Sequence, residues 1–141
     1  MAATTITGIK EVRKLFEAAG KAPAKVLTKA TKSAGKVIQN AAKGNAPEDE
    51  GTLKKAIKLK AEKSKKGKKV YQIFVDANPD FVKYSKEGKR SFYPASQEYG
   101  WTRNGKYTPG FRYMHKAADT HFASAKAMML RVMAEELDKL K

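Results

Sequence analysis

The chain has 141 residues and a formal net charge of +16, from 30 Lys and Arg against 14 Asp and Glu. It contains no cysteine, which excludes disulfides, thiolate metal sites and cysteine nucleophiles. No stretch approaches the roughly 20 apolar residues that span a membrane, and the first twenty residues lack the apolar run of a secretory signal. The length is typical of one domain, which we expect over residues 1–141, with residues 1–7 as a flexible arm.

Two segments near the N-terminus have helical periodicity. Apolar residues recur at helical spacing over residues 9–19, which predicts a short helix. A second apolar stripe covers residues 26–41, with most lysines off it, and predicts an amphipathic helix of about six turns. Pro23 suits its first turn and Gly44 its end. The small residues of this stripe indicate close packing against another element.

A short helix and a hairpin are predicted next. Asp49 can cap a helix over residues 50–56 that points Leu53 inward. From Ile57 onward, apolar and charged residues alternate, which is the pattern of a strand with one exposed face. Residues 70–75 are β-branched and aromatic, so the two segments would pair as an antiparallel hairpin across a lysine-rich turn.

The aromatic residues concentrate in the next part of the chain, where eleven of thirteen lie between Tyr71 and Tyr113. Strands are predicted over residues 81–84 and 91–93. The Asn-Gly pair at 104–105 is a favoured hairpin turn, here between residues 99–101 and Tyr107.

From Arg112 the helical period returns and predicts a long C-terminal helix that reaches Leu140. The expected architecture is therefore α+β. It has N-terminal helices, an antiparallel sheet with a basic hairpin, and a long C-terminal helix packed on one sheet face.

The residue types that carry catalysis do not assemble into a pattern. His115 and His121 are six residues apart on the predicted helix and point about 240° apart, so they cannot share a metal. The acidic run at residues 48–50 suits a helix N-terminus better than acid–base chemistry. Phosphate-binding glycine patterns are absent. We therefore predict no enzyme activity, no catalytic residue, no metal site and no cofactor.

A lysine ridge is the strongest charge feature, with nine lysines and one acid between Lys54 and Lys69. On a hairpin it could contact phosphates without reading sequence, since it contains no arginine. Alternatively it is a solvated edge that opposes aggregation. The candidate phosphate or partner contacts are Lys58, Lys60, Lys63, Lys65, Lys66, Lys68, Lys69, Arg90, Trp101 and Arg103.

Three spaced segments carry a resemblance to a known family. They are Asn45–Ile57 (NAPEDEGTLKKAI), Glu98-Tyr99-Gly100, and Pro109–Met114 (PGFRYM) before the last helix. Their order and spacing resemble the neck or tail-completion family of long-tailed bacteriophages, from about residue 8 to 140. Glu50 stands where that family has a threonine, while Gly51 keeps the glycine. The motif residues are Ala46, Pro47, Asp49, Gly51, Leu53, Glu98, Tyr99, Gly100, Pro109 and Phe111.

The resemblance implies a structural virion protein of the head–tail joint, made in the host cytoplasm and working as a homo-oligomeric ring, with a hexamer expected. It implies head-closure or adaptor proteins and tail-terminator or tail-tube proteins as partners, non-specific exposure to DNA, and no membrane contact. The motif residues suit caps and turns, so we expect assembly contacts from the basic hairpin and from residues 86–108. The alternative is a basic module that binds nucleic acid without sequence preference.

Overall fold

A computed structural model describes residues 23–48, 51–63 and 68–139. Two long helices, α2 (Pro23–Asn45) and α5 (Tyr113–Asp138), bracket a series of short elements. Both helices are confirmed close to their predicted bounds. The helix predicted over residues 9–19 and the arm predicted over residues 1–7 lie outside the described residues.

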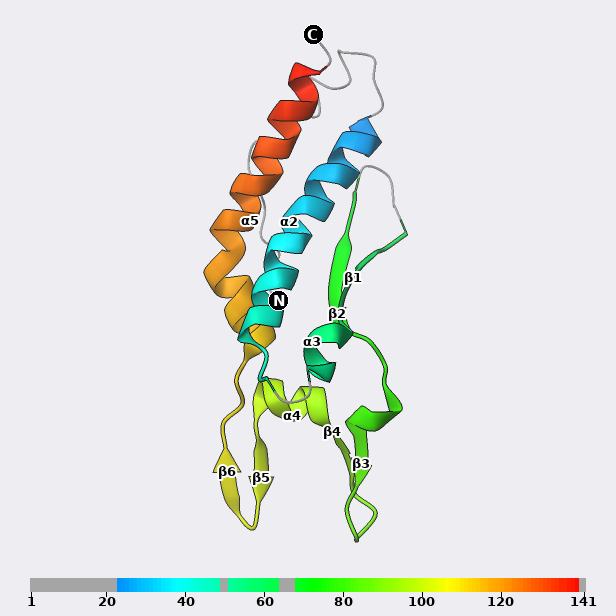
Figure 1. Ribbon diagram of the computed structural model, residues 1–141, viewed down its shortest axis with the longest axis vertical. Helices are drawn as coiled ribbons and strands as arrows, with labels where there is room; N and C mark the ends of the chain where they lie inside the picture. Colours follow the sequence, from blue (N-terminus) through cyan, green and yellow to red (C-terminus); the bar gives the residue numbers. More distant parts are fainter. Residues whose placement is uncertain (1–22, 49–50, 64–67, 140–141) are drawn as a thin grey trace.

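Helices α2 and α5 run antiparallel, side by side along the long axis of the molecule (Figure 1). Alanine predominates among the buried residues of the two helices. Small side chains let two helix backbones approach closely, which accounts for the extensive contact between α2 and α5. The buried aliphatic residues of this helix pair are Val26, Ala30, Ala34, Ala42, Ala117, Ala125, Val132 and Met133.

The predicted basic hairpin is confirmed. Strand β1 (Ile57–Ala61) pairs antiparallel with β2 (Tyr71–Val75), and Leu59 lies opposite Ile73. One face of the hairpin packs on α2 at Gly35, where an added Cβ atom would lie 2.9 Å from Leu59 Cδ1. Because a side chain at that position would push Leu59 away, glycine sets how closely the hairpin approaches the helix.

The α+β class is confirmed, with its layers arranged differently from the prediction. The described residues form three separate two-stranded hairpins instead of one sheet. Helix α5 packs mainly against α2, and α2 lies between α5 and the β1–β2 hairpin (Figure 1). The physical reason is that α2 has two packing faces, the alanines toward α5 and the surface around Gly35 toward the hairpin.

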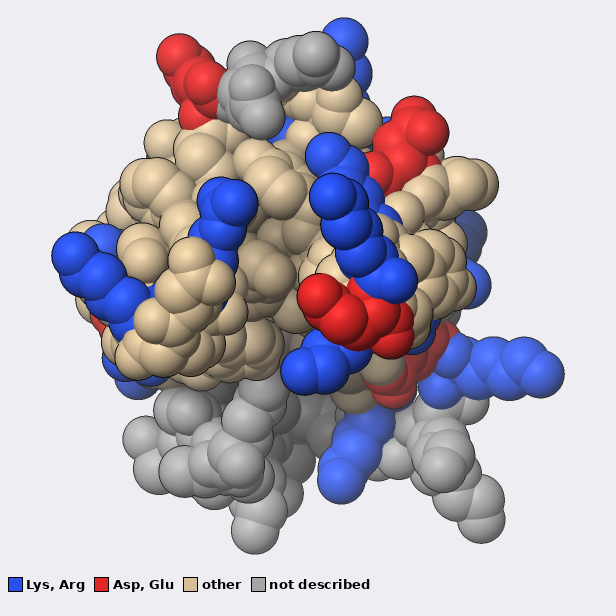
Figure 2. Space-filling model, turned by 90° about the horizontal axis from the view of Figure 1, so that it is seen from below, with Lys and Arg blue, Asp and Glu red and all other residues tan. Residues whose placement is uncertain are grey.

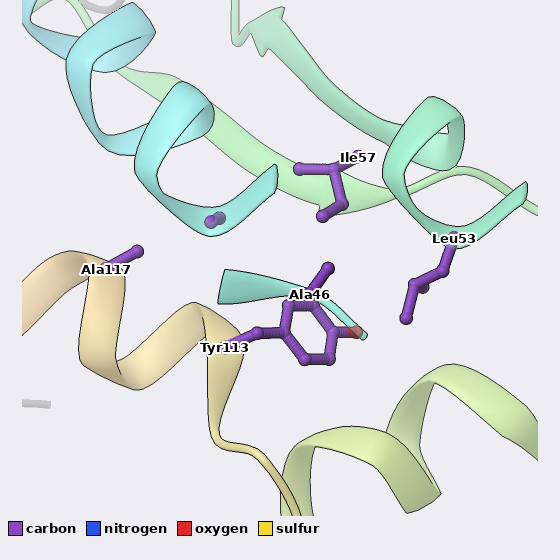
Figure 3. Close-up of a cluster of buried hydrophobic side chains, with 6 residues drawn as sticks. Ala46, Leu53, Ile57, Tyr113 and Ala117 are labelled. Carbon is purple, nitrogen blue, oxygen red and sulfur yellow. The ribbon is translucent and has the colours of Figure 1, made fainter. Parts of the chain in front are cut away.

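A compact core joins the end of α2, the short helix α3 (Thr52–Ala56), and the starts of β1 and α5. Figure 3 shows the Tyr113 ring beside Ala46, with Leu53 and Ile57 pointing into the same space. Each of these four side chains belongs to a residue that is at most 4% exposed. The inward placement predicted for Leu53 is therefore found, and this core fixes the start of α5 relative to the end of α2.

The N-terminus of α3 differs from the prediction. Gly51 occupies the N-cap position with a φ of 73°, a left-handed conformation that favours glycine. Gly51 therefore occupies the N-cap position that was predicted for Asp49. Asp49 itself lies outside the described residues. The reason is that the helix begins at Thr52, two residues later than predicted.

The remaining elements lie at the lower end of the molecule in Figure 1. They are η1 (Pro79–Phe81), β3 (Val82–Tyr84), β4 (Arg90–Phe92), α4 (Tyr93–Tyr99), β5 (Trp101–Arg103) and β6 (Lys106–Thr108). Strand β3 pairs with β4, and β5 pairs with β6. Asn104 and Gly105 have φ values of 51° and 73°, as the predicted tight hairpin turn requires.

Helix α4 is the element that the sequence pattern does not predict. Its aromatic first residue extends the strand pattern of residues 91–93, yet Pro94 lies in the first turn, where proline favours a helix. The prediction placed Tyr99 in the strand before the Asn-Gly turn. In the structure Tyr99 is instead the last residue of α4, and strand β5 begins at Trp101.

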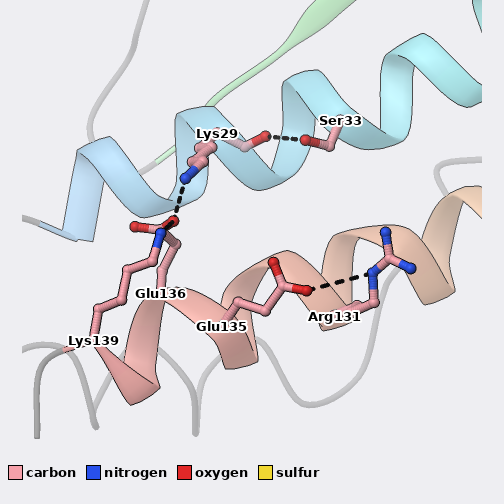
Figure 4. A network of polar contacts seen from close by, with 6 residues as sticks. All are labelled: Lys29, Ser33, Arg131, Glu135, Glu136 and Lys139. Atoms are coloured by element: carbon pink, nitrogen blue, oxygen red, sulfur yellow. Dashed lines mark hydrogen bonds and ion pairs between the residues drawn. The ribbon is translucent and has the colours of Figure 1, made fainter.

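A polar network joins α2 and α5 at the far end of the helix pair (Figure 4). Lys29 pairs with Glu136, and Lys139 Nζ lies 3.0 Å from the same carboxylate. The hydrogen bond from Lys29 lowers the pKa of Glu136, and the carboxylate raises the pKa of Lys29. Because the side chains of both lysines are more than half exposed, these ion pairs add little to stability, and the alanine-rich packing holds the helices together.

Candidate functional site

The predicted motif residues lie in two places. Ala46 and Leu53 are buried in the core, and Pro47 and Gly51 line a surface pocket beside it. Five others meet where α4, the β5–β6 hairpin and α5 join, a region that we call the junction. The junction residues from the prediction are Glu98, Tyr99, Gly100, Pro109 and Phe111.

Glu98 is the buried charged residue of the junction, with 4% of its surface exposed. Its Oε2 accepts a hydrogen bond of 2.8 Å from the backbone N–H of Met114, and its Oε1 accepts one of 3.1 Å from that of His115. The imidazole Nδ1 of His115 lies against the same Oε1 atom. Glu98 therefore caps the start of α5 from another helix, where its negative charge also meets the positive end of the helix dipole.

The capping role explains why a carboxylate is buried at Glu98, for which the sequence indicates no hydrogen-bond donor. The N-cap position of α5 is held by Arg112 in a left-handed conformation, and its side chain makes no capping hydrogen bond. The partners Met114 and His115 are 16 and 17 residues away from Glu98 along the chain. No local sequence signal joins such positions, so the sequence could not predict the pairing.

Two glycines of the junction lie in close backbone contact. At Gly100, with a φ of 95°, an added Cβ atom would lie 2.4 Å from the Thr108 carbonyl oxygen and 2.8 Å from Gly110 N. At Gly110, an added Cβ would lie 2.5 Å from Glu98 O. Gly100 therefore combines a positive φ with a close backbone approach, and Gly110, which is not among the predicted motif residues, is a second position of close approach.

Tyr113 connects the junction to the core. Tyr113 is 1% exposed, and its hydroxyl donates a hydrogen bond of 3.2 Å to the Pro94 carbonyl oxygen in α4. Burial, and next the nearby Glu98 carboxylate, raise the pKa of this hydroxyl well above its usual value of 10.0.

The raised pKa of Tyr113 predicts a loss of stability at alkaline pH. Tyr113 stays protonated in the folded protein after it ionises in the unfolded chain, so its contribution is full below pH 10 and falls above it. We expect the free energy of unfolding of the wild type to fall, relative to Tyr113→Phe, by about 1.4 kcal/mol per pH unit above pH 10. Urea unfolding of both proteins between pH 9 and 11.5 measures this difference, and parallel curves would contradict it.

The lysine ridge begins in α3, which contains Lys54 and Lys55, and continues onto the β1–β2 hairpin. Lys58 and Lys60 flank Leu59 on β1, so they face away from α2. Lys63 and Lys68 are exposed, whereas the Nζ atom of Lys69 lies 5.9 Å from the centre of the Tyr71 ring. Lys65 and Lys66 lie outside the described residues.

The remaining predicted contacts lie on a different surface. Arg90, Trp101 and Arg103 are exposed on the β3–β4 and β5–β6 hairpins, at the lower end of the molecule. Figure 2 looks at this end and shows a broad uncharged surface with separate basic and acidic side chains. The structure therefore divides the predicted contacts between two surfaces instead of bringing them together.

Exposed aromatic side chains gather around the β5–β6 hairpin. The exposed fractions are 64% for Tyr99, 37% for Trp101, 59% for Tyr107 and 48% for Phe111. The Tyr107 hydroxyl donates a hydrogen bond of 2.6 Å to Tyr99 O, which ties the hairpin to the end of α4. An aromatic cluster of this kind on a surface is typical of a protein-binding site.

A pocket of about 500 Å³ opens on the other side of α4. Leu53 and Phe81 lie on its inner side and are each 3% exposed. The Phe81 ring stacks on that of Tyr93, with the ring centres 6.2 Å apart. The lining residues are Pro47, Gly51, Thr52, Leu53, Pro79, Asp80, Phe81, Val82, Lys83 and Tyr93.

These features suit binding by shape and charge. In the described part of the chain, no group of three or more His, Asp or Glu side chains is placed to hold a metal ion. Among the same residues, no helix has the length and apolar character needed to cross a bilayer.

One of three comparisons with known proteins gives a match. Residues 10–100 match the model of the HK97-gp10-like family, described as "Bacteriophage HK97-gp10, putative tail-component". No curated protein matches the chain, and no solved structure does. The matched segment contains all of α2, α3, the basic hairpin, η1, β3, β4 and α4, and it ends at Gly100.

Proposed function

Because this chain belongs to the HK97-gp10-like family of bacteriophage tail components, structural parts of the virion, we propose that it works at the joint between head and tail. In this proposal it forms a ring, expected to be a hexamer, that docks to head-closure or adaptor proteins on one side. On the other side it docks to tail-terminator or tail-tube proteins. Its action is mechanical, and it uses no cofactor.

The observation that carries this proposal is the junction. The β5–β6 hairpin, around which the exposed aromatic side chains gather, is fixed to the helix pair by the buried Glu98 carboxylate and by the close contact at Gly100. Anchoring at its base limits how far the hairpin can move, which lowers the entropic cost of binding through its aromatic side chains. This arrangement supports a role in which the chain holds other proteins in a fixed position.

The proposal is tested by comparing phage particles that assemble with and without this chain. A phage that lacks this chain should produce filled heads and separate tails, and supplying the wild-type chain should restore joined particles. Electron microscopy counts the joined fraction, and mass spectrometry of purified virions detects the chain. Joined particles formed without the chain, or virions that do not contain it, would contradict the proposal.

The lysine ridge supports a second candidate function, binding of nucleic acid without sequence preference. Lys58, Lys60, Lys63 and Lys68 are all exposed, as phosphate contacts require. Binding of this type weakens with salt, with a slope of about 0.9 in the logarithm of affinity per phosphate contact. A flat salt response with duplex DNA would remove this candidate. We favour an acidic protein partner for the ridge, because a basic channel wall would hold DNA that must slide.

A further inference from the structure

Resting on the proposal that this chain docks to other virion proteins, we infer the chemistry of the partner that binds at the β5–β6 hairpin. The contact surface is residues 99–116, which contain the hairpin and the first turn of α5 and which we call the aromatic surface. The hairpin enters a groove on a protein other than a second copy of this chain. That groove has Asp and Glu side chains at its rim and apolar side chains on its floor.

Both faces of the β5–β6 hairpin are open to a partner. All three residues of β5 and two of the three in β6 are exposed. Arg103 lies opposite Lys106, on the face that also carries Trp101. Tyr107, which pairs with Thr102, lies on the opposite face. Figure 1 shows the hairpin projecting beyond the helices, so a groove could enclose it from both sides.

Aromatic side chains give this surface its apolar area. Tyr99, Trp101, Tyr107 and Phe111 are between 37% and 64% exposed. The Tyr99 ring meets the His115 ring edge-on, with the ring centres 5.9 Å apart, so the start of α5 adjoins the hairpin. Aromatic residues and arginine are enriched in the contact surfaces of proteins. Covering these rings requires apolar side chains on the partner.

The exposed charged side chains of the aromatic surface are all basic. Residues 99–116 contain no Asp or Glu. Glu98, which precedes them, is buried and accepts hydrogen bonds from α5, and Asp119 lies beyond the first turn of that helix. Partners are selected by opposite charge, because like charges at a contact are costly. The partner surface is therefore acidic. The exposed basic residues are Arg103, Lys106, Arg112 and Lys116.

A second copy of this chain is a poor match for the aromatic surface. Two copies, each with a net charge of +16, repel one another where basic surfaces meet. Acidic residues in the described part of the chain are in several cases already paired with its own lysines. Glu48 pairs with Lys54, and Glu136 pairs with Lys29. A different protein with an excess of acidic residues is the better match.

Nucleic acid is also a weaker match than an acidic protein. Duplex DNA offers phosphates to the basic residues but keeps its bases stacked inside, so the aromatic rings would stay in water. The chain also places more positive charge elsewhere, with nine lysines in the lysine ridge. An acidic groove with an apolar floor satisfies both the charges and the rings of the aromatic surface.

Photocrosslinking in infected cells identifies the partner. The photoreactive residue p-benzoylphenylalanine, placed at Phe111, should crosslink to a virion protein other than this chain, within a segment that carries net negative charge. Phe111 is 48% exposed. The same residue placed at Phe122, which is 40% exposed on α5, is the control and should not give this product. Circular dichroism checks that both variants fold, and Tyr99 replaces Phe111 if that variant does not.

Charge reversal tests the complementarity. Arg103→Glu combined with Lys106→Glu, in the photoreactive chain, should lower the crosslink yield more than about tenfold. Lys25→Glu combined with Lys32→Glu makes the same change in net charge at two exposed positions of α2, and it should leave the yield unchanged. Equal losses in the two double variants would show that total charge matters and that the aromatic surface does not.

The outcomes separate this inference from the proposed function. A crosslink from position 111 to a second copy, to DNA or to a segment without excess acid would overturn the inference, and so would the absence of a product specific to that position. Any of these results leaves the proposed function standing if joined particles still require the chain. An acidic partner, crosslinked by a chain that joined particles do not require, would support the inference and contradict the proposed function.

Discussion

Replacement of Glu98 by alanine is expected to destabilise the protein by about 2–4 kcal/mol. The substitution removes the carboxylate that accepts hydrogen bonds from the N–H groups of Met114 and His115, so the start of α5 loses its cap. It also removes a negative charge from the positive end of a 26-residue helix. Denaturant unfolding, followed by circular dichroism, measures the loss.

Two variants make this result specific. Glu98→Gln keeps one acceptor oxygen, so it should lose about half as much stability as the alanine variant. Glu135→Ala removes an exposed carboxylate of α5 whose nearest ion-pair contact, to Arg131 Nε, is 3.7 Å, and it should change stability little. A loss at Glu98→Ala no larger than that at Glu135→Ala would contradict the capping role.

Replacement of Gly100 by alanine is the second change with a large expected effect, a loss of about 2–4 kcal/mol. The new Cβ would lie 2.4 Å from the Thr108 carbonyl oxygen, on a backbone with a φ of 95°. The β5–β6 hairpin must then move away from α4. If the β5–β6 hairpin mediates assembly, the joining of heads and tails should weaken in the same variant.

Gly105 provides the matched control. It also has a positive φ, of 73°, but nothing lies within 4 Å of an added Cβ. Gly105→Ala should therefore cost only the backbone strain, about 1–2 kcal/mol. The difference between the two alanine variants, measured in the same unfolding assay, isolates the close contact at Gly100. Equal losses would show that the contact does not matter.

The elements that follow a regular apolar pattern could be predicted from the sequence. The stripe of residues 26–41 gives α2, and the alternation after Ile57 gives β1, because one face of each element is buried. The Asn-Gly pair marks the β5–β6 turn for a local reason, its left-handed backbone. Helix α4 was missed because seven residues are too few to set a helical period and its aromatic start continues a strand pattern.

The residues of the candidate site could be predicted from the sequence, but the contacts between them could not. Glu98 and Gly100 were selected from the motif, yet their partners Met114 and Thr108 are brought near only by the tertiary fold. The pocket of about 500 Å³ beside α4 was not predicted at all. It forms between segments around Leu53, Phe81 and Tyr93, which no periodicity connects.

The two hairpins at the lower end have a consequence for how the protein moves. Each pairs only three residues per strand, and a two-stranded hairpin is marginally stable by itself. Their backbone amides should exchange with solvent sooner than those of α2 and α5, whose packing is much more extensive. Docking against a neighbour would slow that exchange, so the end of the molecule would gain rigidity at the moment of assembly.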